Sequence, residues 1–365
     1  MSSPDAVQDW LRKRASAALT VALFFTLILS SPTNTASAQT VTIDATGDVL
    51  LDRGVAVEVH RHGYGYPFAH IKSTLRAADI AFANLECPLT VNGKPVSKRV
   101  SFKADPQMAA CLVDGDLDIL SCANNHSLDC GGTGLVETMA ALKAKGIKWC
   151  GAGDTLVDAL TPTVIRVRGL RVAFVGFCDF LPEGMALRDD RPTLVMANDD
   201  NVRAAVTVAR KQADIVVASF HWGVEFTDTA NDRQRHLAHL AAQWGADLVL
   251  GHHPHVTQGI EIVHTGKRTC LIDYSLGKIV FDTHLASDKR PESTIILKVD
   301  VNRHGLRAAS VVPVVIHRCA PSPATETEAQ AIDQTLSKLS MELGTRVVRG
   351  HIDLGGKAFE SDSDR

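Results

Sequence analysis

From Val41 onward, short apolar runs alternate with amphipathic segments, and this alternation constrains the fold more than any other feature of the sequence. Apolar and β-branched runs of about five to nine residues are typical of buried strands. The segments between them repeat their apolar residues at helical spacing. A chain that alternates in this way is expected to form an α/β domain with a largely parallel sheet.

The alternation gives specific expected elements. Strands are expected at residues 41–47, 79–85, 117–123, 163–167, 172–177, 215–220, 248–251, 269–275, 294–301 and 308–316. Helices are expected at residues 67–78, 106–114, 134–145, 201–212, 233–243 and 326–343. The later strands have no helices between them, so that part of the sheet should be antiparallel or mixed.

Composition limits the domain organisation and the partners. With 45% hydrophobic residues, the chain can bury one large core, which we assign to residues 39–320. Residues 321–365 should add a helix and a polar, disordered tail. The net charge of −3 and the 5% aromatic content argue against nucleic acid as a partner.

The N-terminus resembles an export leader. Residues 11–14 are basic, residues 15–29 are uncharged, and Ala36-Ser37-Ala38 has the small-x-small pattern of a cleavage site. We therefore expect residues 1–38 to be a signal peptide and the protein to be exported, periplasmic or extracellular. The alternative is that the segment stays uncleaved as a membrane anchor.

The eight cysteines form no regular framework. No CxxC pair occurs, and several cysteines lie inside apolar runs. Buried free thiols are the simplest expectation, and the sequence assigns no disulfide pairs.

Polar residues follow the apolar strands at the points where the strands end. The residues are Asp48, Glu86, Asn125 with His126, His221, and His253 with His255. Ligands of open α/β sheets bind at the carboxyl ends of strands, so these side chains should meet at one edge. Each motif alone has an ordinary structural explanation, such as a turn, a cap or a buried histidine. Their coincidence at separate strand ends is the stronger signal.

This set of side chains suits a divalent metal. Carboxylate oxygens, an amide oxygen and neutral imidazoles are ligands for Mn²⁺, Zn²⁺ or Fe, and the set leaves open whether one or two ions bind. Gly47 and Gly251 would let the backbone turn sharply where the strands end. His252-His253-Pro254-His255 is the most specific stretch. In extended backbone His253 and His255 would share one side, and His252 would point away.

At these residues the sequence resembles the CapA-type family of poly-γ-glutamate capsule biosynthesis proteins. The resemblance runs from about residue 41 to 282, in the stretches GDVLLDRG, ANLECPLT, ANNHSLDCGGTGL, SFHWGVEF, GADLVLGHHPHVTQGIE and DYSLGKIVFD. The family is placed with the calcineurin-like metallophosphoesterases. The resemblance therefore implies an α-β-β-α sandwich, in which two sheets are flanked by helices, with a divalent metal centre.

The resemblance also implies individual roles. Metal ligands carried over from the family are Asp48, Glu86, Asn125, His221, His253 and His255. His126 matches a histidine that is not a ligand and could protonate a leaving group, with Asp129 either orienting it or capping the next helix.

The sequence departs from the wider superfamily in two places. The usual Asp-x-His start is missing, because Thr46 and Leu50 flank Asp48 where a histidine would stand. Lys278 stands where related chains commonly have asparagine. Both departures bear on the number of metals and on what the site binds.

Two classes of function follow. One is metal-assisted hydrolysis or transfer at a phosphoester or at the γ-amide of a glutamate polymer. The other is a non-catalytic exported subunit that serves a membrane polymer synthase or exporter. Basic residues that could hold an anionic substrate are Arg53 first, then Lys98, Arg99, Lys103 and Lys278.

Overall fold

A computed structural model describes residues 39–184, 186–266, 268–282 and 292–355. The predicted leader and the polar tail after residue 355 lie outside these residues. Contacts divide the chain into residues 1–38 and 39–365, and the second unit is described here. Within the described ranges, no helix combines the length and apolar character that crossing a bilayer requires. All eight cysteines lie in the described part and are buried with free thiols, as expected.

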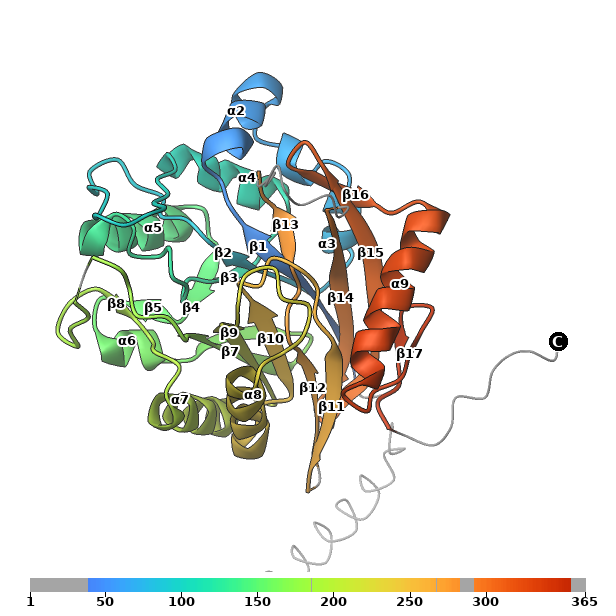
Figure 1. Cartoon of the computed structure of the whole chain (residues 1–365). Coiled ribbons are helices and arrows are strands. Elements are labelled where there is room, and N and C mark those ends of the chain that lie inside the picture. The colour runs from blue at the N-terminus through green and yellow to red at the C-terminus, as the bar shows by residue number, and fades with distance from the viewer. Residues whose placement is uncertain (1–38, 185, 267, 283–291, 356–365) are drawn as a thin grey trace, which may run out of the picture. The chain divides into compact units, whose positions relative to one another are not determined.

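Two sheets form the centre of this unit (Figure 1). The larger runs in the order β17-β18-β15-β14-β1-β2-β3-β4, with β13 beside β1 and β16 beside β15. Its strands are β1 (Val41–Val49), β2 (Ile80–Leu85), β3 (Ile119–Ser121), β4 (Lys148–Cys150), β13 (Lys278–Val280), β14 (Ser293–Asn302), β15 (Gly305–His317), β16 (Ala320–Pro323), β17 (Val347–Val348) and β18 (His351–Ile352).

The smaller sheet runs in the order β11-β12-β10-β9-β7-β6. Its strands are β6 (Thr163–Val167), β7 (Leu170–Cys178), β9 (Ile215–His221), β10 (Leu248–His252), β11 (Ile260–Thr265) and β12 (Arg268–Asp273). A separate ribbon pairs β5 (Ala152–Gly153) with β8 (Thr193–Leu194). Strands β1 to β4 are parallel, as are β7, β9, β10 and β12, whereas β14 and β15 are antiparallel. The expected change from parallel to antiparallel pairing is confirmed.

Helices and 3₁₀ turns cover the sheets. They are α2 (Arg53–His62), η1 (Tyr66–Phe68), α3 (Lys72–Arg76), η2 (Pro106–Met108), α4 (Ala109–Asp114), α5 (Gly131–Ala144), α6 (Leu156–Leu160), α7 (Asp199–Gln212), α8 (Asp232–Trp244) and α9 (Glu326–Met341). Capping boxes at Asn231 and Thr325 explain where α8 and α9 begin, because in each the side chain and the third residue satisfy backbone donors reciprocally.

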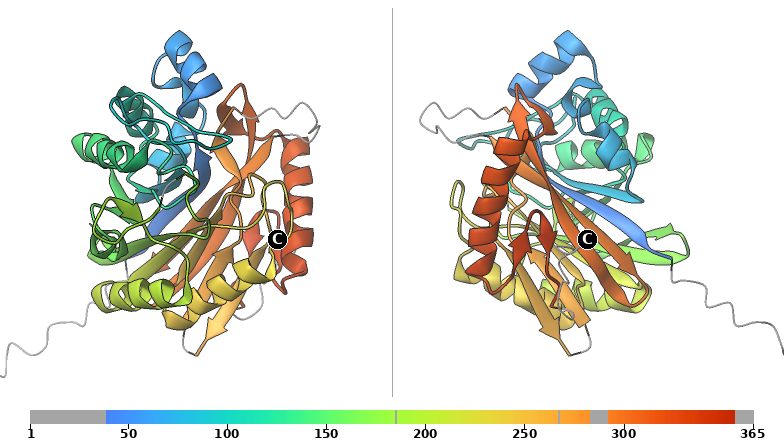
Figure 2. Two further views of the ribbon diagram at one scale, coloured as in Figure 1. Left: turned by 60° about the vertical axis from the view of Figure 1, so that its left-hand side comes forward. Right: turned by 90° about the vertical axis from the view of Figure 1, so that its right-hand side faces the viewer.

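Three apolar cores produce the layers. One lies between the sheets, with Ile43, Phe82 and Leu250 among its members. A second joins the outer face of the larger sheet to α2, α3, α4 and α5, and a third joins the smaller sheet to α7 and α8. Figure 2 shows α9 running beside the long strands, where it contacts β15 and β11. The expected sandwich of two sheets flanked by helices is confirmed.

Two close backbone approaches bring strand ends of the sandwich together. A Cβ atom on Gly47 would lie 2.0 Å from the carbonyl oxygen of Gly277, and one on Gly251 would lie 2.0 Å from that of Tyr274. Neither Gly47 nor Gly251 has positive φ. The prediction that they provide sharp turns is therefore wrong, and close packing of neighbouring backbone is the reason that only glycine fits.

The region after β1 differs from the prediction. We expected one helix over residues 67–78, but η1 and the short α3 occupy this stretch, and α2 precedes them. The Asp52 side chain caps α2, and Val55 and Val59 bury one helical face. We did not predict α2 because its β-branched residues favour strands when only local sequence is considered.

Candidate metal centre

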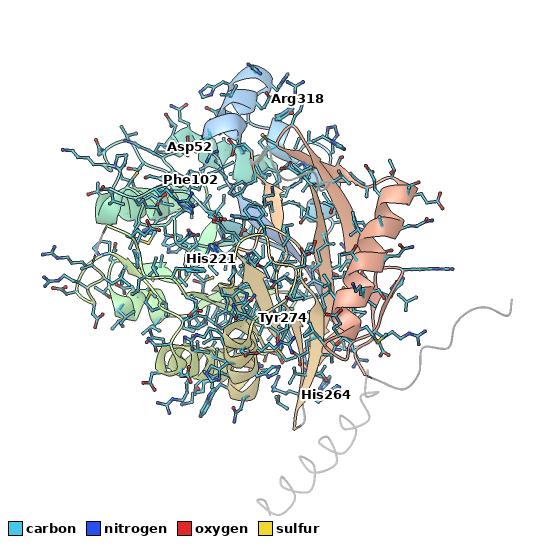
Figure 3. The ribbon with its side chains drawn as sticks, in the orientation of Figure 1. Asp52, Phe102, His221, His264, Tyr274 and Arg318 are labelled. Atoms are coloured by element: carbon cyan, nitrogen blue, oxygen red, sulfur yellow. The ribbon has the colours of Figure 1, made fainter. Side chains whose placement is uncertain are left out.

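The side chains predicted to meet at the strand ends lie together in the structure. One group of potential ligand atoms comes from Asp48, Glu86 and His255, and a second comes from Glu86, His221 and His253. Within each group the atoms lie within 4.8 Å of one another, and all the residues are buried. Glu86 belongs to both groups. Figure 3 shows His221 near the middle of the view, with Phe102 and Asp52 above it.

Glu86 lies at the centre of the cluster. Both of its carboxylate oxygens are buried, and neither has a hydrogen-bond partner among the described residues. Oε1 lies 3.7 Å from Nε2 of His221, 3.8 Å from Nε2 of His255 and 4.0 Å from Nε2 of His126. Burial, with the charge of Asp48 added, raises the pKa of Glu86 well above its usual range. A buried carboxylate without partners fits a cation held between it and the imidazoles.

Asp48, in contrast, has several polar neighbours. Its Oδ1 accepts a hydrogen bond from Asn84 Nδ2 at 2.8 Å, and His252 Nδ1 lies 3.3 Å from the same oxygen. Its Oδ2 lies 3.1 Å from His255 Nδ1. Burial alone would raise the pKa of Asp48, but the imidazoles of His252 and His255 hold it well below the usual range. Asp48 is therefore suited to carry negative charge in this buried place.

Asn125 and His221 face each other across the second group. Asn125 Oδ1 lies 2.9 Å from His221 Nε2, and His253 Nδ1 lies 3.2 Å from the same nitrogen. Burial lowers the pKa of His221 well below 6.5 and that of His253 to about 3. Both imidazoles are therefore neutral at pH 7, which is the form that binds metals.

The backbone of the histidine pair differs from the prediction. His253 has φ of 95° and His255 has φ of 59°, so neither is extended. Both still turn toward the cluster, because the chain bends sharply after β10. Phe226, whose backbone N–H donates to the carbonyl of Pro254 at 2.7 Å, also has positive φ. Non-glycine residues with positive φ cost free energy and concentrate at functional sites. His252, which was expected to point away from His253 and His255, lies with Nδ1 3.3 Å from Oδ1 of Asp48 and packs against the ring of Phe82.

His126 and Asp129 form a pair beside the cluster. Nδ1 of His126 lies 2.7 Å from Oδ2 of Asp129, and both side chains are buried. Burial lowers the pKa of His126, although Asp129 acts in the opposite direction. The α5 helix begins after Cys130 without a side-chain cap. Asp129 thus contacts the histidine rather than capping the helix.

Phenylalanine rings lie around the imidazoles. Phe102 lies 4.2 Å from His126 between ring centroids, Phe180 lies 4.2 Å from His253, and Phe281 lies 4.9 Å from His255. These rings remove water from one side of each imidazole. Water exclusion strengthens electrostatic interactions inside the cluster.

The two basic residues that were predicted to bind substrate, Arg53 and Lys278, lie at the margin of the carboxylate and imidazole cluster. Arg53 is 47% exposed, pairs with Asp282 at 3.4 Å and stacks over the Phe102 ring at 5.5 Å. Lys278 is nearly buried and pairs with Glu292 at 3.1 Å. Their contact with a substrate remains a prediction.

Sequence reasoning missed the role of Asn84 and assigned a different role to Lys98. Asn84, two positions before Glu86, holds Asp48 and also accepts a hydrogen bond from Asn124 Nδ2 at 3.0 Å. Its place on β2 was the only available signal. Lys98 was considered as a substrate cation, but its ammonium group donates to Asp129 and to the Asn125 carbonyl.

The fold and the cluster together define an α/β sandwich with a buried carboxylate and imidazole centre at its strand ends. The chain belongs to the family described as bacterial capsule synthesis protein PGA_cap, which matches residues 42–283.

Relatives share this sequence over most of its length. The chain is 32% identical to the PGA biosynthesis protein CapA of Bacillus subtilis, over 76% of this chain and 72% of that protein. It is 29% identical to a probable polyglutamine synthesis accessory protein of Mycobacterium tuberculosis, over 84% of each chain. The expected family membership is confirmed.

Similar solved structures are more distant. A hypothetical protein from Thermus thermophilus has a TM-score of 0.45 and 17% identity, covering 74% of this chain and 98% of its own. A 5′-nucleotidase precursor from the same organism has a TM-score of 0.45 and 13% identity. The match covers 81% of this chain and 58% of the precursor.

Proposed function

We propose that this protein is a metal-dependent hydrolase that acts on an anionic substrate during synthesis or processing of a poly-glutamate polymer. The observation that carries the proposal is the buried Glu86 carboxylate, which faces imidazoles and has no hydrogen-bond partner among the described residues. The proposed metal ligands are Asp48, Glu86, Asn125, His221, His253 and His255. Because Glu86 belongs to both ligand groups, it would be a ligand whether one ion binds or two.

The donor set indicates which ions suit the centre. Imidazole nitrogens and carboxylate and amide oxygens favour Mn²⁺, Zn²⁺ or Fe. Such an ion, when bound, would stabilise negative charge as a Lewis acid and make water a better nucleophile at neutral pH.

The residues of the chain supply the rest of the reaction. His126 lies beside the cluster without belonging to either ligand group, so it is suited to donate a proton to a leaving group. Asp129 accepts a hydrogen bond from the Nδ1–H group of His126 and so directs Nε2 toward the cluster. In ester hydrolysis a water oxygen bonds to phosphorus, the ester P–O bond breaks, and the leaving oxygen takes the Nε2 proton of the doubly protonated His126 ring, which keeps its Nδ1 proton on Asp129. A proton released by the water restores the histidine.

The substrate class is argued from charge and from relatives. A phosphoester and a γ-linked glutamate polymer both bring negative charge to a centre built for cations. The name of the B. subtilis relative refers to PGA biosynthesis, which favours the polymer pathway. The leader-like segment ending at residue 38 supports an exported location, where the protein could meet a membrane synthase or exporter.

A second candidate function is non-catalytic. The name of the M. tuberculosis relative contains the words accessory protein. In that role the protein would bind the polymer or its synthase, and metal would stabilise the fold or the binding surface.

One experiment separates the two. The full chain, with Mn²⁺ added, is tested on methyl p-nitrophenyl phosphate and on γ-linked glutamate oligomers. The hydrolase proposal predicts turnover that needs metal and falls by about 10²- to 10⁴-fold in His126→Ala while metal is retained. His264→Ala is the control, because His264 lies far from His221 in the fold (Figure 3). Polymer binding without turnover of either substrate, unchanged in His126→Ala, would favour the accessory role.

A further inference from the structure

The loop of residues 91–104, called here the covering loop, forms several hydrogen bonds with Asp129. The backbone N–H of Val96 donates to the Asp129 carbonyl at 2.8 Å, and the Ser101 hydroxyl contacts the same carbonyl at 3.3 Å. The backbone N–H of Phe102 donates to the Asp129 carboxylate at 2.7 Å. Asp129 thus ties the loop to the segment that carries His126.

Lys98 is the charged residue of the covering loop that enters this buried region. Its side chain is 5% exposed, and that of Asp129 is 1% exposed. Its ammonium group donates to Oδ1 of Asp129 and, at 2.9 Å, to the backbone carbonyl of Asn125. Two of the three N–H donors of this ammonium group therefore bind groups within the protein.

The two carboxylate oxygens of Asp129 therefore accept hydrogen bonds from different groups. Oδ1 faces Lys98, and Oδ2 accepts from Nδ1 of His126 and from the covering loop. Lys98 Nζ lies 3.4 Å from His126 Nδ1, where two donors cannot hydrogen-bond to each other. Lys98 therefore leaves Oδ2 for the histidine, and this keeps a proton on Nδ1, so that a second proton taken up by the ring is carried on Nε2.

We propose that Lys98 is a positioning residue for His126, which it holds through Asp129 with Nε2 turned toward the cluster. This inference rests on the proposed function, in which the doubly protonated ring donates its Nε2 proton to the leaving group and keeps the Nδ1 proton on Asp129. An ordinary buried ion pair would stabilise the fold alone. The positioning role makes the further claim that Lys98 matters most when the leaving group needs a proton.

Two aryl esters test that claim. Methyl p-nitrophenyl phosphate releases a weakly basic phenolate that leaves with little help, whereas methyl phenyl phosphate releases a more basic phenolate that needs the proton. Lys98→Met should lower kcat for the phenyl ester by about 10- to 100-fold and affect the p-nitrophenyl ester much less, with KM and bound metal unchanged. Lys98→Arg should recover most of the loss.

A matched control comes from the same loop. Lys103 also donates to backbone carbonyls, those of Val91 and Gly93 at 2.9 Å each, and within the part of the chain that the structure describes its ammonium group forms no hydrogen bond with Asp129. Lys103→Met should leave the ratio of the two kcat values unchanged. Lys98→Gln provides a second variant that keeps a donor without the charge, in case Lys98→Met does not fold.

Ring-nitrogen NMR provides a readout that needs no turnover. In the wild type, ¹⁵N shifts of His126 should show the proton on Nδ1, and Lys98→Met should give mixed tautomers. Equal loss on both esters, or an unchanged tautomer in both Lys98→Met and Lys98→Gln, would overturn the inference. If the wild type hydrolyses neither ester, the esterase proposal fails, while the tautomer measurement still decides the role of Lys98.

Discussion

Nε2 of His221 lies 3.7 Å from Oε1 of Glu86, close enough to share a cation and too far to form a hydrogen bond. The two residues come from different sheets, since Glu86 follows β2 and His221 ends β9. This contact across the sandwich is what turns separate strand ends into one centre.

Metal affinity should rise with pH, and Glu86 is the reason. Its pKa is raised by burial, so at a pH below that raised pKa the carboxyl group holds a proton that it must lose when a cation binds. His221 and His253, whose pKa values are lowered, are already neutral and release no proton. Calorimetry of Mn²⁺ binding in buffers of different ionisation enthalpy should show proton release that Glu86→Gln abolishes. Proton release unchanged in that variant would contradict the assignment.

Asn84 should support the metal centre without binding metal itself. It donates to Oδ1 of Asp48 at 2.8 Å and fixes that carboxylate. Asn84→Ala should weaken Mn²⁺ binding by about 10- to 100-fold, because residues that orient ligands typically matter to that extent. Titration of the variant against wild type checks this. Affinity equal to that of wild type would show that Asp48 needs no such support.

Asp273 should make the fold less stable as pH rises. It is fully buried, Oδ2 has no hydrogen-bond partner among the described groups, and burial raises its pKa from 3.8 to about 8. Between these values the folded state holds a proton that the unfolded state has lost, so the stabilisation is complete below pH 3.8 and is lost as pH rises through 8. Relative to wild type, Asp273→Asn should gain up to about 1.4 kcal/mol per pH unit across that range.

Urea unfolding of wild type and Asp273→Asn at pH 5, 6 and 7 measures the difference. A difference in unfolding free energy that stays constant over these pH values would show that Asp273 is ionised in the folded protein.

Gly251 should tolerate no side chain. A Cβ there would lie 2.0 Å from the carbonyl oxygen of Tyr274, so Gly251→Ala should lower the unfolding free energy by about 3 kcal/mol or more. Gly132 is the matched control, because in α5 its added Cβ meets nothing closer than 3.5 Å. Gly132→Ala should gain about 0.5–1 kcal/mol from helix propensity. Equal unfolding midpoints for the two variants would refute the close approach.

The sequence was informative about which strands carry polar residues, because strand ends can be read from local apolar runs. Asp48, Glu86 and His221 lie where that pattern predicted. The conformations of His253 and His255 could not be predicted in the same way, since their positive φ values depend on neighbouring loops such as the one containing Phe226.

Contacts between residues that are distant in the sequence could not be predicted either. The pairing of Lys98 with Asp129 joins residues from different loops, and nothing in local spacing distinguishes that lysine from exposed ones. The α2 helix was missed because valines favour strands locally, whereas the Asp52 cap and the burial of Val55 and Val59 favour the helix in the folded chain.

Metal analysis of the full chain tests the central claim most directly. Wild type and the His253→Ala/His255→Ala double variant are purified under mild conditions, exposed to Mn²⁺, Zn²⁺ or Fe²⁺, desalted and measured for bound metal. We predict bound metal in the wild type and a large loss in the folded double variant. Wild-type protein that carries no metal and takes up none, or a double variant that binds as much as the wild type, would contradict the proposed centre.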